Sequence, residues 1–100
     1  MMEVVSRTSI LRRCYEDSAR ASRRWGTSIG PKYIQCITIA RAAEKFADLF
    51  QFRSLHVHPL TGDHKGKYAM TIHGRWRLIL TWDETQETLI LEEVTNHYGD

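Results

Sequence analysis

The spacing of hydrophobic residues changes near the middle of the chain and separates a helical half from a strand-rich half. Apolar residues recur at helical spacing after Thr8 or Ser9, which are both typical N-cap residues, and they continue to Trp25. Gly26 then ends the pattern, as glycine commonly does after a helix. The sequence therefore predicts a helix from about Ser9 to Trp25, preceded by a short strand at residues 3–5.

A second helix is predicted after a short turn. Pro31 lies where the first turn of a helix tolerates proline, because the N–H groups there have no partner in the helix. From Tyr33 to Phe50 one face carries a stripe of aromatic and aliphatic side chains. Such a stripe is typical of a helix that packs on a sheet and not of a cofactor site, so we expect this helix to contribute most to the core.

In the second half the hydrophobic period becomes two, which is typical of strands. Leu55 and Val57 alternate with His56 and His58, so we expect both histidines on one face of a short strand. Pro59 follows directly and either confines this strand to an edge of the sheet or ends it.

The next two strands are predicted to form a hairpin. A two-residue loop between them would split their apolar residues between the two faces of the sheet. A three-residue connection, Ile72–Gly74 with Gly74 in the left-handed conformation, keeps the apolar residues together and pairs Thr71 with Arg75. Four side chains then share the face opposite the core: Ala69, Thr71, Arg75 and Arg77.

A last strand, Thr88–Thr95, follows a polar turn. The whole pattern predicts an α+β fold in which two N-terminal helices pack on one face of a mainly antiparallel sheet. A chain of 100 residues with 42% hydrophobic residues can bury one modest core. Residues 1–100 are therefore expected to form a single domain.

The charged residues are unevenly distributed, although the formal net charge is only +2. The central segment is basic, whereas residues 83–100 contain no Lys or Arg. This distribution indicates that one surface meets an acidic or polyanionic partner, and the alternative is an ordinary mixed, solvated surface. The first quarter holds six arginines: Arg7, Arg12, Arg13, Arg20, Arg23 and Arg24.

Several further features bear on the compartment and on cofactors. Cys14 and Cys36 lie on apolar helix faces and are expected to be buried free thiols in a reducing cytoplasm. The sequence has no apolar signal core and no run of ~18 apolar residues, so a cytoplasmic protein without membrane contact is expected. His56 and His58 could chelate a metal, but no cysteine or carboxylate stands at a familiar zinc spacing, so we expect neither a metal nor another cofactor.

The segment His56–Trp82 concentrates the reactive side chains of the chain. It holds four of the five histidines together with two lysines and two arginines. These residues occupy turns and alternating strand positions, where a sheet would hold them in a fixed register. This density favours a functional site over a merely solvated surface.

Three motifs in this half carry a resemblance to a known family. They are His58–Tyr68 (HPLTGDHKGKY), Gly74–Leu78 (GRWRL) and Glu92–Tyr98 (EEVTNHY). In this order and at these spacings the motifs resemble the HigB-type toxins of the RelE/ParE superfamily, over about residues 55–98. The resemblance implies a RelE-like fold and a ribosome-dependent messenger RNA endonuclease from a bacterial type II toxin–antitoxin system.

The resemblance also implies the partners of the protein. A cognate helix-turn-helix antitoxin of the HigA type would neutralise it, and DNA would be contacted only through that antitoxin. The ribosome and messenger RNA would be its targets. Two alternatives remain open: a gyrase-poisoning, ParE-like toxin with the same fold, and a module that binds RNA or protein without catalysis.

RNA cleavage without a metal needs a base for the 2′-hydroxyl, an acid for the 5′-oxygen and cationic donors around the phosphorane. By its place in the resemblance, Arg77 is assigned the stabilisation of the phosphorane, and His58 is a candidate base or acid. Arg77 could instead stack on a ring or pair with Glu92. The sequence leaves the roles of base and acid open among four residues: His58, Lys65, His97 and Tyr98.

Basic residues elsewhere in the chain are candidates for contacts with the RNA backbone. For the two histidines among them, a solvated turn position is the alternative. The candidates are Arg53, His64, Lys67, His73 and Arg75.

Overall fold

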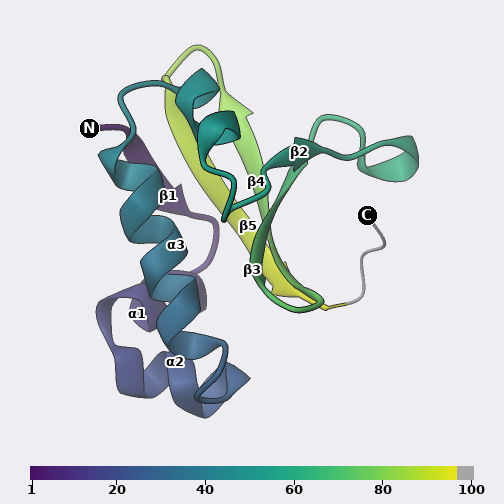
Figure 1. The fold of residues 1–100 in the computed structure, drawn as a ribbon. Helices are drawn as coiled ribbons and strands as arrows, with labels where there is room; N and C mark the ends of the chain where they lie inside the picture. Colours follow the sequence, from purple (N-terminus) through teal and green to yellow (C-terminus); the bar gives the residue numbers. More distant parts are fainter. Residues whose placement is uncertain (97–100) are drawn as a thin grey trace.

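The protein is an α+β domain in a computed structural model that describes residues 1–96 (Figure 1). Within these residues, three α-helices and two short 3₁₀ helices accompany one five-stranded sheet. The elements in chain order are β1 (Glu3–Ser6), α1 (Ser9–Glu16), α2 (Ser18–Trp25), α3 (Gly30–Ala42), η1 (Phe46–Gln51), β2 (His58–Pro59), η2 (Gly62–His64), β3 (Tyr68–His73), β4 (Trp76–Asp83) and β5 (Thr88–Thr95).

The strands lie in the order β1-β5-β4-β3-β2. Strand β1 pairs with β5 in parallel. The other pairings among the described strands are antiparallel. The three α-helices cover one face of the sheet, as Figure 1 shows. The predicted fold class is therefore confirmed, and so are the short first strand and the bounds of the last strand.

The predicted first helix is broken into two. Asp17 has an extended backbone, with φ −141° and ψ 104°, and separates α1 from α2. Its carboxylate accepts hydrogen bonds from the N–H groups of Ala19 (3.0 Å) and Arg20 (3.2 Å). The prediction of one helix is wrong because this side chain caps a new helix start. The outer ends are confirmed: Thr8 is the N-cap of α1, and Gly26, at φ 93°, follows α2.

The second predicted helix is too long. Helix α3 ends at Ala42, and the rest of the predicted stripe lies in the separate 3₁₀ helix η1. Asp48 begins this new turn by accepting a hydrogen bond from the Lys45 N–H (3.3 Å). At its other end α3 lies so close to α2 that a Cβ on Gly30 would sit 2.6 Å from the Ser22 nitrogen. Glycine is therefore required at this helix crossing.

The predicted strand Leu55–His58 is mostly irregular. Strand β2 contains only His58 and Pro59, at the edge of the sheet where the proline was expected. His56 has a left-handed backbone at φ 46°, which an extended strand cannot accommodate. The shared strand face predicted for the two histidines is therefore wrong, although their rings lie 5.0 Å apart.

The β3–β4 hairpin keeps the predicted faces in a different register. Gly74 is left-handed, at φ 57°, as predicted, but Thr71 pairs with Arg77 and not with Arg75. A bulge between Thr71 and His73 adds the odd residue that keeps the apolar side chains on one face. Arg75 therefore lies in the turn, two positions from its predicted place.

The main core lies between the helices and the sheet. It contains Tyr33 and Ile37 of α3 together with Leu80 of β4, all at most 1% exposed. Cys14 and Cys36 are buried free thiols, as predicted, and burial raises the pKa of Cys36 to about 11. No helix within residues 1–96 is long and apolar enough to cross a lipid bilayer.

Candidate nucleic-acid interface

We call the sheet face that points away from the helices the outer face, and the strands place two candidate site residues on it, His58 and Arg77. Residues paired across neighbouring strands share a face, so the register defines its members. At its centre a small apolar cluster of Leu60, Ala69 and Ile79 is buried separately from the main core. This cluster gives the polar side chains around it a rigid floor.

Arg77 lies on the outer face in one row with Thr71 of β3 and Thr95 of β5. It is half-buried, and its Nη1 donates to the backbone oxygens of Gly74 (2.7 Å) and Trp76 (3.1 Å). These bonds hold the guanidinium group at the tip of the β3–β4 hairpin. A guanidinium carries five N–H donors, so bonds from one nitrogen do not by themselves exhaust its capacity to bind a phosphate.

His58 reaches the outer face from the edge strand β2, where it pairs with Ala69. Its Nδ1 lies 2.9 Å from the carbonyl oxygen of His56. A carbonyl oxygen only accepts, so Nδ1 carries the hydrogen and Nε2 holds the lone pair of the neutral ring. The left-handed backbone of His56 aims that carbonyl at the ring. This hydrogen bond selects the tautomer with the lone pair on Nε2, an atom that is buried in the structure.

His58 and Arg77 share the outer face but lie on strands that are not adjacent. They are two strands and two residues apart, since His58 pairs with Ala69 while Arg77 pairs with Thr71. At ordinary sheet spacing this separation is roughly 12 Å between Cα atoms. One phosphodiester group between the two side chains could approach both of them.

The loop between β2 and β3 contributes three basic candidates. His64 and Lys65 lie at and directly after η2, and Lys65 is exposed. Lys67 precedes Tyr68, which pairs with Leu80, so Lys67 lies about four residues along β4 from Arg77. That distance is roughly 13 Å. The structure therefore places the lysines at the opposite end of the outer face from Arg77.

The hairpin tip contributes two further candidates beside Arg77. His73 and Arg75 flank Gly74, and both are exposed. Arg53 is also exposed and begins the turn in which the His56 N–H donates to the Arg53 oxygen (3.2 Å). The tip is therefore a compact basic end of the sheet.

The predicted candidates His97 and Tyr98 lie outside the described residues. Strand β5 ends at Thr95, which pairs directly with Arg77. The last residue of β5 therefore lies beside Arg77, two positions before His97 in the sequence.

Sequence reasoning missed a charged network at the other end of the outer face. Arg7 binds Glu92 through two hydrogen bonds, from Nε to Oε1 (3.0 Å) and from Nη2 to Oε2 (2.9 Å). Thr81 donates to Oε2 of Glu92 as well (2.6 Å). The bond from Arg7 is the largest cause that lowers the pKa of Glu92. Glu92 is therefore the partner of Arg7, and its predicted alternative pairing with Arg77 is wrong.

The only sequence signal for this network was the short first strand. Parallel pairing of β1 with β5 brings the Arg7 N–H to the oxygen of Leu91 (2.8 Å), and Arg7 then lies beside Glu92. The two residues are 85 positions apart in the chain. The ion pair with Arg7 also offsets the negative charge of Glu92, which would otherwise repel a phosphate from this face.

No protein-family model matches the sequence, and no curated protein matches it significantly. Solved structures do match the fold. A YoeB/ParE toxin from Agrobacterium tumefaciens aligns with a TM-score of 0.62 at 19% identity, over 97% of this chain and 100% of the other. YafQ from E. coli strain BL21(DE3) aligns with a TM-score of 0.54 at 18% identity, over 97% of this chain and 94% of the other.

A third similar structure is a YoeB–YefM complex from Staphylococcus aureus. Its matching chain aligns with a TM-score of 0.55 at 13% identity, over 98% of this chain and 99% of the other. At these identities the likeness establishes the fold. The chain has the RelE-like α+β fold of the YoeB, ParE and YafQ toxins, over 97–98% of its length.

Proposed function

We propose that this protein is the toxin of a bacterial type II toxin–antitoxin system and an endoribonuclease that cleaves messenger RNA on the ribosome. The fold shared with YoeB, ParE and YafQ toxins supports the general class. The observation that carries the nuclease activity is the placement of His58 and Arg77 on one face of the sheet, with the His58 tautomer selected by His56. The HigB-type motifs support the subgroup.

The proposed reaction uses the 2′-hydroxyl of the RNA as the nucleophile and needs no metal. Nε2 of His58 is buried in the structure, so the ring must first turn toward the RNA. Nε2 then takes the proton as the 2′-oxygen bonds to phosphorus, and Arg77 donates to the oxygens of the phosphorane. The bond between phosphorus and the 5′-oxygen then breaks, and an acid protonates that oxygen. The products are a 2′,3′-cyclic phosphate and a 5′-hydroxyl. Lys65, His97 and Tyr98 are the candidates for the acid.

The remaining candidates would bind the RNA backbone on either side of the scissile phosphate. His73 and Arg75 would do so at the hairpin tip, and His64 and Lys67 at the far end of the outer face, with Arg53 beside the turn before β2. Because these contacts are electrostatic, they position RNA without reading its sequence. A contact with the ribosome would then limit cleavage to translated messages in the cytoplasm.

The proposed partner is a HigA-like, helix-turn-helix antitoxin that neutralises the toxin and alone contacts DNA. The YoeB–YefM complex supports the presence of a protein partner for this fold. We expect the two genes to be tolerated together and the toxin alone to arrest growth.

The test is brief induction in a bacterial host, followed by mapping of messenger RNA ends by primer extension. Cleavage within translated regions, with 2′,3′-cyclic phosphate ends, supports the proposal. An Arg77→Ala variant of equal abundance is the control and should leave transcripts intact. Intact transcripts together with DNA breaks would support a gyrase poison instead, and growth without either lesion would support a binding module.

A further inference from the structure

Helices α1 and α2 form a second basic surface, separate from the outer face of the sheet. It is a hollow of about 350 Å³ lined by Ile10, Cys14 and four arginines. We call these residues the arginine cluster: Arg13, Arg20, Arg23 and Arg24. The helices pack on the other side of the sheet (Figure 1), so this hollow is distinct from the outer face. Arg24 alone of the cluster also lines a hollow with Trp76 and Thr95, at the end of the sheet near Arg77.

The described acidic side chains form no ion pair with the arginine cluster, although Arg24 also lines an adjacent hollow together with Glu92 and Glu93. None of its members forms an ion pair within residues 1–96, whereas Arg7 is paired with Glu92 and Arg12 with Glu16. Glu16 and Asp17 are the nearest acids along the chain. Glu16 pairs with Arg12, and the Asp17 carboxylate accepts the backbone N–H groups at the start of α2. The cluster is therefore a site of concentrated positive charge.

The spacing of the cluster makes this arrangement costly for the free protein. Arg20, Arg23 and Arg24 stand at i, i+3 and i+4 on α2, where like charges face one another and destabilise a helix. Both Arg20 and Arg24 lie close enough to Cys14 to act on its thiol, although burial outweighs them and raises the pKa of Cys14. An anionic group in the hollow would relieve the repulsion.

The floor of the hollow distinguishes between kinds of anionic partner. Ile10 is 45% exposed at this surface. A sugar–phosphate backbone cannot usefully bury an aliphatic side chain, and no aromatic ring lines the hollow on which a base could stack. A polypeptide can supply carboxylates and an apolar side chain together.

We propose that this hollow is the docking site for an acidic segment of a protein partner, which places carboxylates on the arginine cluster and an apolar side chain over Ile10. Guanidinium groups suit carboxylates because they bind them through two parallel hydrogen bonds. If the proposed function is correct, the antitoxin is the partner that carries this segment. Because the hollow and the outer face lie on different sides of the sheet, the segment would hold the antitoxin without itself covering His58. At Arg24 it would reach the end of the sheet near Arg77.

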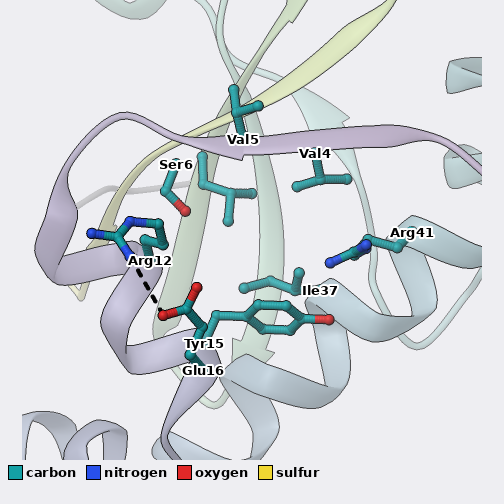
Figure 2. Close-up of a pocket in the computed structure, with 9 residues that line it drawn as sticks. Val4, Val5, Ser6, Arg12, Tyr15, Glu16, Ile37 and Arg41 are labelled. Carbon is teal, nitrogen blue, oxygen red and sulfur yellow. Dashed lines mark hydrogen bonds and ion pairs between the residues drawn. The ribbon is translucent and has the colours of Figure 1, made fainter.

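A neighbouring hollow provides the matched control. Figure 2 shows it beneath β1, with Arg12 and Arg41 at its rim and the guanidinium of Arg12 directed at Glu16. Arg12 has the same charge as the cluster members and, like Arg13, lies on α1. Its ion pair with Glu16 (3.5 Å) gives it a counter-charge that they lack.

The experiment is a fluorescence anisotropy titration of the full chain with a labelled, 16-residue helical peptide that carries Glu and Leu on one face. A peptide with Gln in place of Glu and a labelled RNA hairpin serve as comparison probes. We expect R20Q/R23Q/R24Q to weaken binding of the acidic peptide about 10- to 100-fold, since each exposed pair contributes a few-fold. We expect Ile10→Ser to weaken it about 5-fold and Arg12→Gln to change it less than 2-fold.

Three results would overturn the proposal. The acidic peptide could fail to bind at low salt, Arg12→Gln could cost as much as the loss of a cluster arginine, or the RNA hairpin could bind more tightly than the peptide with no effect of Ile10→Ser. Messenger RNA cleavage by the R20Q/R23Q/R24Q variant distinguishes a failure of the docking proposal from a failure of the nuclease proposal. Retained cleavage with lost peptide binding supports the docking site, and retained peptide binding without any cleavage by the parent protein would count against the proposed function alone.

Discussion

The two faces of the sheet differ in how they are buried. On the helix side, 19 buried residues form one continuous core. On the outer side, Leu60, Ala69 and Ile79 are the only described residues that are buried together, and polar side chains surround them. The difference indicates that the helix side supplies stability, while the outer side uses a minimum of apolar area to hold functional groups in place.

Truncation of core leucine Leu80 should have the largest effect on folding. Leu80→Ala removes a side chain that is fully buried under the helices, and we expect a loss of about 4 kcal/mol in the free energy of unfolding. Ile79→Ala on the outer face should cost about 2 kcal/mol, because water can fill the space that it leaves. Urea denaturation of both variants measures this contrast. Equal losses would mean that the two faces contribute equally to stability.

Changing His58 should affect catalysis while leaving the fold intact. His58→Asn keeps an N–H donor near the His56 oxygen but has no equivalent of Nε2. We expect RNA cleavage to fall about 100-fold or more, the scale for loss of a general base, with a melting temperature close to that of the parent. Cleavage rates on programmed ribosomes and thermal denaturation measure the two effects. Unchanged cleavage would remove His58 from the mechanism.

The smallest effect is expected at the network of Arg7, Glu92 and Thr81. The folded protein has a lowered Glu92 pKa, chiefly because Arg7 donates to it, so the pair stabilises the protein above the unfolded pKa of Glu92. This stability is lost as the pH falls through the folded pKa. Glu92→Gln should lower the melting temperature at pH 7 by roughly 2–4 °C and reduce its decrease on acidification. A melting curve at pH 7 and one at pH 3 test this, and an unreduced acid effect would contradict it.

The sequence predicted which residues share a face better than it predicted which residues pair. The period of two, together with an odd number of residues between Thr71 and Arg77, places both on the same face. A bulge changes the register without changing the face, so the pairing with Arg77 in place of Arg75 could not be read from alternation. The left-handed His56 likewise depends on tertiary contacts, since the Leu55 oxygen accepts the Thr71 N–H (2.7 Å).

At another position where the structure differs from the prediction, the sequence held a local signal that the hydrophobic period concealed. Asp17 interrupts the apolar pattern only weakly, but its side chain is a good N-cap and it starts α2. The pair of Arg7 and Glu92 had no local signal, because it depends on the parallel pairing of the two ends of the chain. Alternation therefore predicted the face on which Arg77 lies, whereas the pairing of Arg7 with Glu92 depends on contacts distant in sequence.

The most direct test of the nuclease site compares Arg77→Ala with Arg75→Ala. Both arginines belong to the same hairpin, but Arg77 lies on the outer face and Arg75 lies in the exposed turn. Measured as cleavage of messenger RNA on purified ribosomes, Arg77→Ala should lose on the order of 100-fold or more, because it removes a donor to the phosphorane. Arg75→Ala should lose less than about 10-fold, since it removes one backbone contact. Equal and small losses for two well-folded variants would contradict the assignment of the outer face as a ribonuclease site.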